Sequence, residues 1–190
     1  MWKIIIGFIN LFLFISCTSN SNKSILVTCN IDSISVVYFN YNFVSSKSID
    51  CNNILTAKTP TMEEDGLGLL DATFYDESIL KEICEELKLL EPSKNQYPLD
   101  TRLAVKIYKK NKIEYLCSDG YRLFKDGVLL SKNNRLLYLL KNNAGYYSWF
   151  KEEELMEMDE LSDTTFVKEP FVISPYYEEY RKTQLGNVSD

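Results

Sequence analysis

The chain has 190 residues, of which 45% are apolar and 25% charged, with a formal net charge of −6 and no histidine. This length favours one domain, large enough to bury roughly 70% of the surface of the unfolded chain. The composition is that of a globular protein. It excludes a wholly disordered chain, a collagen-like repeat and a multi-span membrane protein.

Two features of the composition narrow the functional classes. Lys and Arg total 21 against 27 Asp and Glu, so no cationic excess can neutralise phosphates, and we expect no nucleic-acid partner. The absence of histidine excludes Ser-His-Asp and Cys-His catalysis and every metal site that contains histidine. Gly66 and Gly68 are not followed by the third glycine of a dinucleotide-binding loop, and the sequence has no P-loop for phosphate binding. It also has no Cys-x-x-Cys motif, which zinc sites commonly contain. We therefore expect no enzymatic activity, no cofactor and no metal.

The N-terminal residues have the pattern of a secretory signal. Lys3 supplies a positive charge, and a mostly apolar run of thirteen residues extends from Ile4 to Ser16. A transmembrane helix needs about 20 apolar residues, so this run is too short to span a bilayer and suits a signal peptide instead. We therefore predict a signal peptide over residues 1–16.

The signal ends in Phe14-Ile15-Ser16-Cys17, which resembles the lipobox of bacterial lipoproteins, with Phe14 where leucine is usual. The resemblance implies cleavage before Cys17 and attachment of diacylglycerol to its thiol. It also implies an anchor in the cell envelope, at the outer membrane rather than the inner one, because Thr18 and not aspartate follows the cysteine. Ordinary cleavage and an uncleaved anchor are the alternatives. Residues 17–24 are polar and rich in Ser and Asn, which predicts a flexible tether.

Two short motifs extend the resemblance. Asp32-Ser33-Ile34 and Asp163-Thr164-Thr165 resemble the O-glycosylation motif of Bacteroidota envelope proteins. The second half of the chain, with strands around two Asp-Gly turns followed by a leucine-rich helix, is similar to small envelope lipoproteins of these bacteria. This resemblance implies no particular activity.

Four cysteines remain after Cys17, in a compartment that permits disulfides. Two disulfides are possible in any of three pairings. Alternatively, Cys84 on an apolar helix face and Cys117 in a strand both suit buried free thiols. The candidate disulfide residues are Cys29, Cys51, Cys84 and Cys117.

The first part of the folded domain is expected to contribute strands. Residues 25–29 and 33–44 are rich in β-branched and aromatic residues on either side of a short turn, so they predict an opening hairpin. Residues 45–65 are polar and contain Pro60, which is typical of a long surface loop. A further strand is expected over residues 66–74.

Apolar residues at helical spacing predict a helix over residues 76–91, with charged residues on its opposite face. Asp76 suits the N-cap, and Pro92 follows the end of the helix. Four strand-like runs come next, separated by short turns, two of which contain the hairpin-favouring dipeptide Asp-Gly. We expect these runs, over residues 103–109, 112–117, 121–124 and 128–131, to form an antiparallel meander of three or four strands.

Two shorter helices are expected after the meander. Four leucines between residues 136 and 140 fit one face of the first, with Asn134 as its cap and Gly145 beyond its end, although such an apolar run also suits a strand. The second is expected over residues 148–161, whose early glutamates suit the N-terminal turns of a helix. Residues 25–190 thus predict a single α+β domain, a mainly antiparallel sheet with two or three helices packed on it.

The negative charge is concentrated in the C-terminal part of the chain. Residues 151–190 contain eleven acidic and four basic residues, a net of −7, whereas residues 17–150 contain sixteen of each. Aromatic residues lie among these carboxylates, and desolvated aromatic anchors with a charged rim are typical of protein-binding surfaces. The alternative is a solvated acidic tail whose aromatics pack back on the sheet. The candidate partner-binding residues are Glu152, Glu153, Glu154, Glu157, Tyr176, Tyr177 and Tyr180.

Together these features indicate a non-catalytic, lipid-anchored binding module of the cell envelope. Its protein partner is expected to be basic, and one concrete form is an immunity or inhibitor protein that neutralises a basic secreted toxin or lytic enzyme. One alternative is a carboxylate-dependent envelope hydrolase, with acidic pairs such as Glu153 and Glu157 or Glu82 and Glu86. The other is a structural lipoprotein of a larger envelope complex.

Replacement of Cys17 by alanine tests the predicted anchor. The native chain is expected in the membrane fraction, with an intact mass that begins at Cys17 and includes acyl chains, because two or more acyl chains make membrane attachment stable. The Cys17→Ala chain should lack that added mass and leave the membrane fraction. Identical masses and fractionation for the two chains would contradict lipidation.

Overall fold

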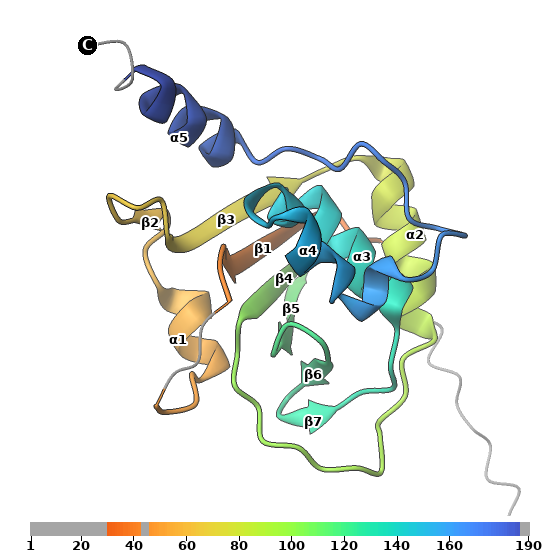
Figure 1. Ribbon diagram of the computed structural model, residues 1–190. Helices are drawn as coiled ribbons and strands as arrows, with labels where there is room; N and C mark the ends of the chain where they lie inside the picture. The colour runs from red at the N-terminus through yellow and green to blue at the C-terminus, as the bar shows by residue number, and fades with distance from the viewer. Residues whose placement is uncertain (1–29, 43–45, 187–190) are drawn as a thin grey trace, which may run out of the picture.

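The computed structural model describes residues 30–42 and 46–186, in which one antiparallel sheet of seven strands carries helices on both faces (Figure 1). The strands lie in the order β2-β3-β1-β4-β5-β6-β7. This architecture confirms the α+β class expected from the sequence. The strands are β1 (Ser33–Phe39), β2 (Thr61–Met62), β3 (Gly68–Phe74), β4 (Leu103–Lys109), β5 (Lys112–Ser118), β6 (Leu123–Lys125) and β7 (Val128–Leu129).

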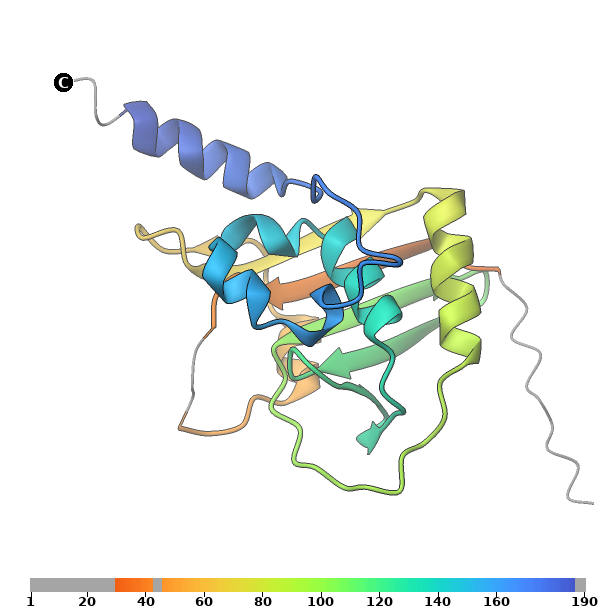
Figure 2. The ribbon, with the colours of Figure 1, turned by 45° about the vertical axis from the view of Figure 1, so that its right-hand side comes forward.

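Most of the helices lie on one face of the sheet (Figure 2). There α2 and α3 cover the main core, in which Val36 and Tyr38 of β1 are completely buried. On the opposite face, Ile54 of α1 packs on Val37 and Ala104. The helices are α1 (Cys51–Thr56), α2 (Glu77–Lys88), α3 (Asn134–Asn143), α4 (Glu152–Met156) and α5 (Pro175–Gly186), with two 3₁₀ helices, η1 (Tyr146–Trp149) and η2 (Asp159–Leu161).

β1 is a central strand, and this overturns the predicted opening hairpin. β1 pairs with β3 along one edge, from Ile34 to Phe39, and with β4 along the other, from Ser33 to Tyr38. Because both edges are occupied by non-local partners, no edge remains for residues 25–29, which lie outside the described residues. The strand also ends at Phe39 and not at residue 44.

The predicted loop over residues 45–65 contains two short elements. The Asp50 side chain accepts a hydrogen bond from the backbone N–H of Asn52 at 2.7 Å and caps α1, and Thr61 and Met62 form β2. Six residues are too few to show helical periodicity, so α1 could not be predicted from the sequence. Its position depends on burial of Ile54 and on a covalent bond.

That bond is a disulfide between Cys51 and Cys117, which ties α1 to β5 across a sequence separation of 66 residues. Closing a loop of this length stabilises the fold by about 4 kcal/mol, because it removes conformational entropy from the unfolded chain. Cys84, buried on α2, is also disulfide-bonded. The expectation of free thiols at Cys84 and Cys117 is therefore wrong. Cys29 and Cys17 lie outside the described residues.

The middle of the chain follows the sequence-based expectation closely. Asp76 caps α2 by accepting hydrogen bonds from the backbone N–H groups of Ser78 and Ile79. The four strands of the predicted meander are β4 to β7, each paired with the next. The Asp-Gly turns adopt left-handed glycine conformations, with φ of +98° at Gly120 and +77° at Gly127.

The leucine-rich run forms α3, as expected, with Asn133 rather than Asn134 as its side-chain cap. Gly145 follows the helix with φ of +69°, and a Cβ atom there would lie 2.6 Å from the backbone of Ser174. The single helix predicted over residues 148–161 is wrong. The chain is extended at Phe150 and Met158, so it forms η1, α4 and η2, and both side chains are buried in the main core.

The β4–β5–β6 hairpins carry a charged cluster around Glu114. Its carboxylate lies 2.9 Å from Lys109 Nζ and 3.5 Å from Lys125 Nζ, and it also pairs with Lys112. Partial burial alone would raise the pKa of Glu114, but hydrogen bonds from Lys112 and Lys109 and the charge of Lys125 lower it to about 2. The ionised carboxylate therefore stabilises the folded state.

Glu114→Gln is expected to destabilise the protein at neutral pH by on the order of 1 kcal/mol, because the site is partly solvent-screened. Since the folded pKa is lowered to about 2 from an ordinary 4.5, the contribution is present above pH 4.5 and is lost as the pH falls through 2. Urea unfolding of both proteins from pH 7 to pH 2 measures the difference, with exposed Glu169→Gln as the charge control. A Glu114→Gln deficit that persists undiminished at pH 2 would contradict the assignment.

Candidate functional site

The C-terminal third is organised around a buried ion pair between Lys141 of α3 and Glu160 of η2, whose side chains are 2% and 0% exposed. Lys141 Nζ also donates to the carbonyl of Gly120 at 2.8 Å and lies 4.8 Å from the centre of the Tyr146 ring. The Tyr147 hydroxyl donates to Glu160 Oε1 at 3.3 Å. One ion pair thus joins α3, η1, η2 and the β5–β6 turn.

The electrostatics of this pair follow from its burial. Desolvation lowers the pKa of Lys141, and the adjacent Glu160 carboxylate opposes that shift. Desolvation, and then the negative charge of Glu160, raise the pKa of Tyr147 well above its ordinary value, which keeps its hydroxyl available as a donor. Sequence reasoning missed the pair. The available signal was the position of Lys141 on the apolar face of α3, four residues after buried Leu137.

The acidic residues predicted to bind a partner do not all have the same environment. Glu152, Glu153 and Glu157 are exposed on and just after α4. Glu154 instead accepts a hydrogen bond from the backbone N–H of Lys151 at 2.9 Å and caps α4. Three of the four predicted glutamates therefore remain on the surface, and Glu154 has a structural contact.

The three predicted tyrosines attach α5 to the body of the protein. The Tyr176 hydroxyl lies 3.4 Å from Asp71 Oδ1 on β3. The Tyr177 and Tyr180 rings lie 5.1 and 6.0 Å from the Trp149 ring of η1. All three are half-buried, so these aromatics pack back on the body while the neighbouring glutamates face solvent.

A third acidic segment, the β2–β3 turn, lies against α5 and contacts its Tyr180. The Tyr180 hydroxyl donates to the carbonyl of Asp65 at 3.1 Å. The Tyr180 ring also covers Gly66, where a Cβ atom would lie only 2.6 Å from it. Glu63, Glu64 and Asp65 are exposed on this turn. Sequence reasoning treated them as part of a loop, because their proximity to α5 depends on contacts between residues 115 positions apart.

The contacts of Tyr180 bring the exposed carboxylates of the β2–β3 turn and α5 together, and α4 follows η1, whose Trp149 contacts α5. Figure 2 shows α4 toward the same side of the molecule as the β2–β3 turn and α5. The same segments carry three exposed cations, Lys151, Arg181 and Lys182. We call this surface the acidic end. Its eight carboxylates belong to Glu63, Glu64, Asp65, Glu152, Glu153, Glu157, Glu178 and Glu179.

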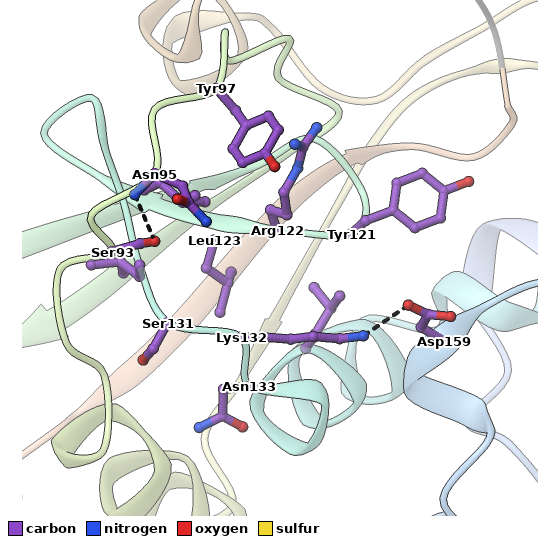
Figure 3. A pocket seen from close by; sticks show the side chains of 13 residues that line it. Ser93, Asn95, Tyr97, Tyr121, Arg122, Leu123, Ser131, Lys132, Asn133 and Asp159 are labelled. Atoms are coloured by element: carbon purple, nitrogen blue, oxygen red, sulfur yellow. Dashed lines mark hydrogen bonds and ion pairs between the residues drawn. The ribbon is translucent and has the colours of Figure 1, made fainter.

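A separate cavity of about 580 Å³ lies between the loop at residues 93–97, the β5–β6 turn, β7 and the start of α3 (Figure 3). We call it the β6–α3 pocket. Tyr97 and Tyr121, both exposed by half or more, lie along one wall, and Lys132 reaches Asp159 on the other. Buried leucines line its interior: Leu123, Leu129, Leu130 and Leu137.

Each cation in this pocket has a carboxylate partner. Arg122 Nε donates to Asp119 Oδ2 at 2.7 Å, and its guanidinium lies 4.4 Å from the centre of the Tyr97 ring. Lys132 Nζ lies 2.8 Å from Asp159 Oδ2, and this hydrogen bond and charge lower the pKa of Asp159. Asp159 is thus held as a carboxylate, which accepts hydrogen bonds and does not donate a proton.

The acidic pairs considered for hydrolysis lie elsewhere. Glu153 and Glu157 are exposed on the acidic end. Glu82 and Glu86 both pair with Arg135, at 3.1 and 3.4 Å. Among the described residues, Asp159 is the one carboxylate that lines the β6–α3 pocket.

No protein-family model, curated protein or solved structure matches this chain. Over residues 30–42 and 46–186, no helix combines the length and the apolar character needed to cross a membrane. The function is therefore inferred from the chain's own residues.

Proposed function

We propose that this protein is a lipid-anchored, non-catalytic binding module of the bacterial cell envelope that takes a basic protein partner on its acidic end. An immunity or inhibitor protein against a basic secreted toxin or lytic enzyme is the concrete form of this proposal. The observation that carries it is the gathering of eight exposed carboxylates, against three cations, from segments far apart in the sequence.

The charge of the acidic end favours fast encounter with a cationic protein. Like charges held close together on one surface create a potential that steers an oppositely charged partner and raises the association rate. The half-buried rings of Trp149, Tyr177 and Tyr180 lie among these carboxylates and are already fixed by their mutual contacts. Rings that are ordered before binding lose little conformational entropy in the complex, which favours affinity.

The direction of β1 suits membrane attachment at the end of the molecule opposite the acidic end. Asn40, just beyond β1, donates its side-chain amide to the Gly66 carbonyl at 2.8 Å, so β1 ends at the acidic end. From Ser33 to Phe39, β1 spans about 20 Å at 3.3 Å per residue, and Asn30 lies beyond its opposite end. Figure 2 places the start of the described chain on the side opposite α5. A lipid at Cys17 would therefore attach the domain from the side opposite the acidic end.

Hydrolysis by carboxylates is the weaker alternative. Such catalysis needs two facing acids with separated pKa values in one cleft. The β6–α3 pocket offers Asp159, whose pKa is lowered by Lys132, and the paired glutamates on α2 and α4 lie outside it.

Neutralising the acidic end should slow association with the partner. The full chain is used to capture its partner from the envelope and secreted fractions, and association rates are then measured across a range of salt. Glu152→Gln, Glu153→Gln and Glu157→Gln in one chain are expected to lower the low-salt association rate about tenfold and to flatten its salt dependence. Glu154 is left intact because it caps α4.

The matched control removes three exposed carboxylates elsewhere, with Asp32→Asn, Glu77→Gln and Glu91→Gln, and should leave the association rate unchanged. Equal rates for the two triple variants would contradict the electrostatic role of the acidic end. An acidic captured partner would contradict the proposal as a whole.

A further inference from the structure

The β6–α3 pocket is a preformed concavity that the acidic end does not include. Its volume of about 580 Å³ lies within the roughly 300–1,000 Å³ typical of small-ligand sites. Its walls are held by backbone hydrogen bonds: Ser93 N–H donates to the Leu129 carbonyl at 2.8 Å, and Ser131 N–H to the Glu91 carbonyl at 2.7 Å. A ligand would therefore enter a shape that already exists.

The charge balance of the pocket disfavours an ionic ligand. Arg122 is neutralised by Asp119, and Lys132 by Asp159, both within 2.8 Å. An anion would have to compete with these carboxylates, and a cation with the paired Arg and Lys. A neutral polar ligand can accept and donate hydrogen bonds at this rim without separating either pair.

The remaining lining combines apolar faces with short polar groups. Tyr97 and Tyr121 are 50% and 56% exposed at the mouth, and one face of the Tyr97 ring is covered by the Arg122 guanidinium, 4.4 Å from the ring centre. Asn95 projects an exposed amide beside Tyr97, and the Asp159 carboxylate lies on the facing wall (Figure 3). Pyranose rings have matching features, because their C–H faces stack on aromatic rings while their hydroxyls pair with amide, guanidinium and carboxylate groups.

We propose that the β6–α3 pocket binds a neutral saccharide. One sugar ring stacks on Tyr97 or Tyr121 at the mouth, and its hydroxyls bond to Asn95, Arg122 and Asp159. The leucines below exclude water from the apolar face of the sugar. This site is independent of the acidic end, so the protein would hold a glycan while its acidic end remains free.

The test uses the full folded chain and a panel of neutral oligosaccharides, namely maltotriose, N,N′-diacetylchitobiose and mannobiose. Binding is measured by saturation-transfer NMR and by calorimetry at sugar concentrations up to about 10 mM, which detects millimolar affinity. At least one sugar should bind, and Tyr97→Ala or Asn95→Ala should weaken it about tenfold. Both side chains are exposed, so their removal leaves the core intact.

Tyr115→Ala is the matched control, since Tyr115 is a similarly exposed tyrosine on β5 that does not line the pocket. Its binding should equal that of the native chain. Failure of every neutral sugar to bind, equal loss in Tyr115→Ala and Tyr97→Ala, or tighter binding of glucuronic acid than of the neutral sugars would each overturn the proposal.

Discussion

The buried pair of Lys141 and Glu160 is the interaction on which the C-terminal third depends. Removing either partner alone would leave an unpaired charge in the core, at a cost of about 3–5 kcal/mol. Lys141 also binds the Gly120 carbonyl of the β5–β6 turn, and Glu160 also accepts from Tyr147 of η1. This charged contact therefore adds to the apolar packing of Phe150 and Met158 in holding η1 and η2 against α3 and the sheet.

Both proposed binding surfaces include residues adjacent to the elements that the Lys141–Glu160 pair joins. Trp149 ends η1 and packs against Tyr177 and Tyr180, which positions α5 beside the β2–β3 turn. Asp159 begins η2, directly before Glu160, and forms one wall of the β6–α3 pocket. The acidic end and the pocket are thus separate surfaces that share the same internal contact, and loss of that contact would disturb both.

Local patterns in the sequence predicted local structure, and long-range contacts account for the failures. Periodicity and the Asp76 cap predicted α2, and Asp-Gly turns predicted the β4–β7 meander. The opening hairpin failed because β1 pairs with distant strands, and α1 was missed because a disulfide and one buried isoleucine hold it. Of the acidic end, the exposed glutamates of α4 were predicted from the sequence. The position of the β2–β3 turn beside α5 was not predicted, because it depends on the contact between Tyr180 and Asp65, which lie 115 residues apart.

Hydrogen exchange on Lys141→Met and on Lys141→Met/Glu160→Met tests the role of the ion pair most directly. The single variant should lose amide protection over residues 146–186, while β1 and β4 stay protected, because Glu160 is left buried without its cation. The double variant should recover most of that protection, because the uncompensated charge is gone. Full protection in the single variant, or equal loss in both, would contradict the account.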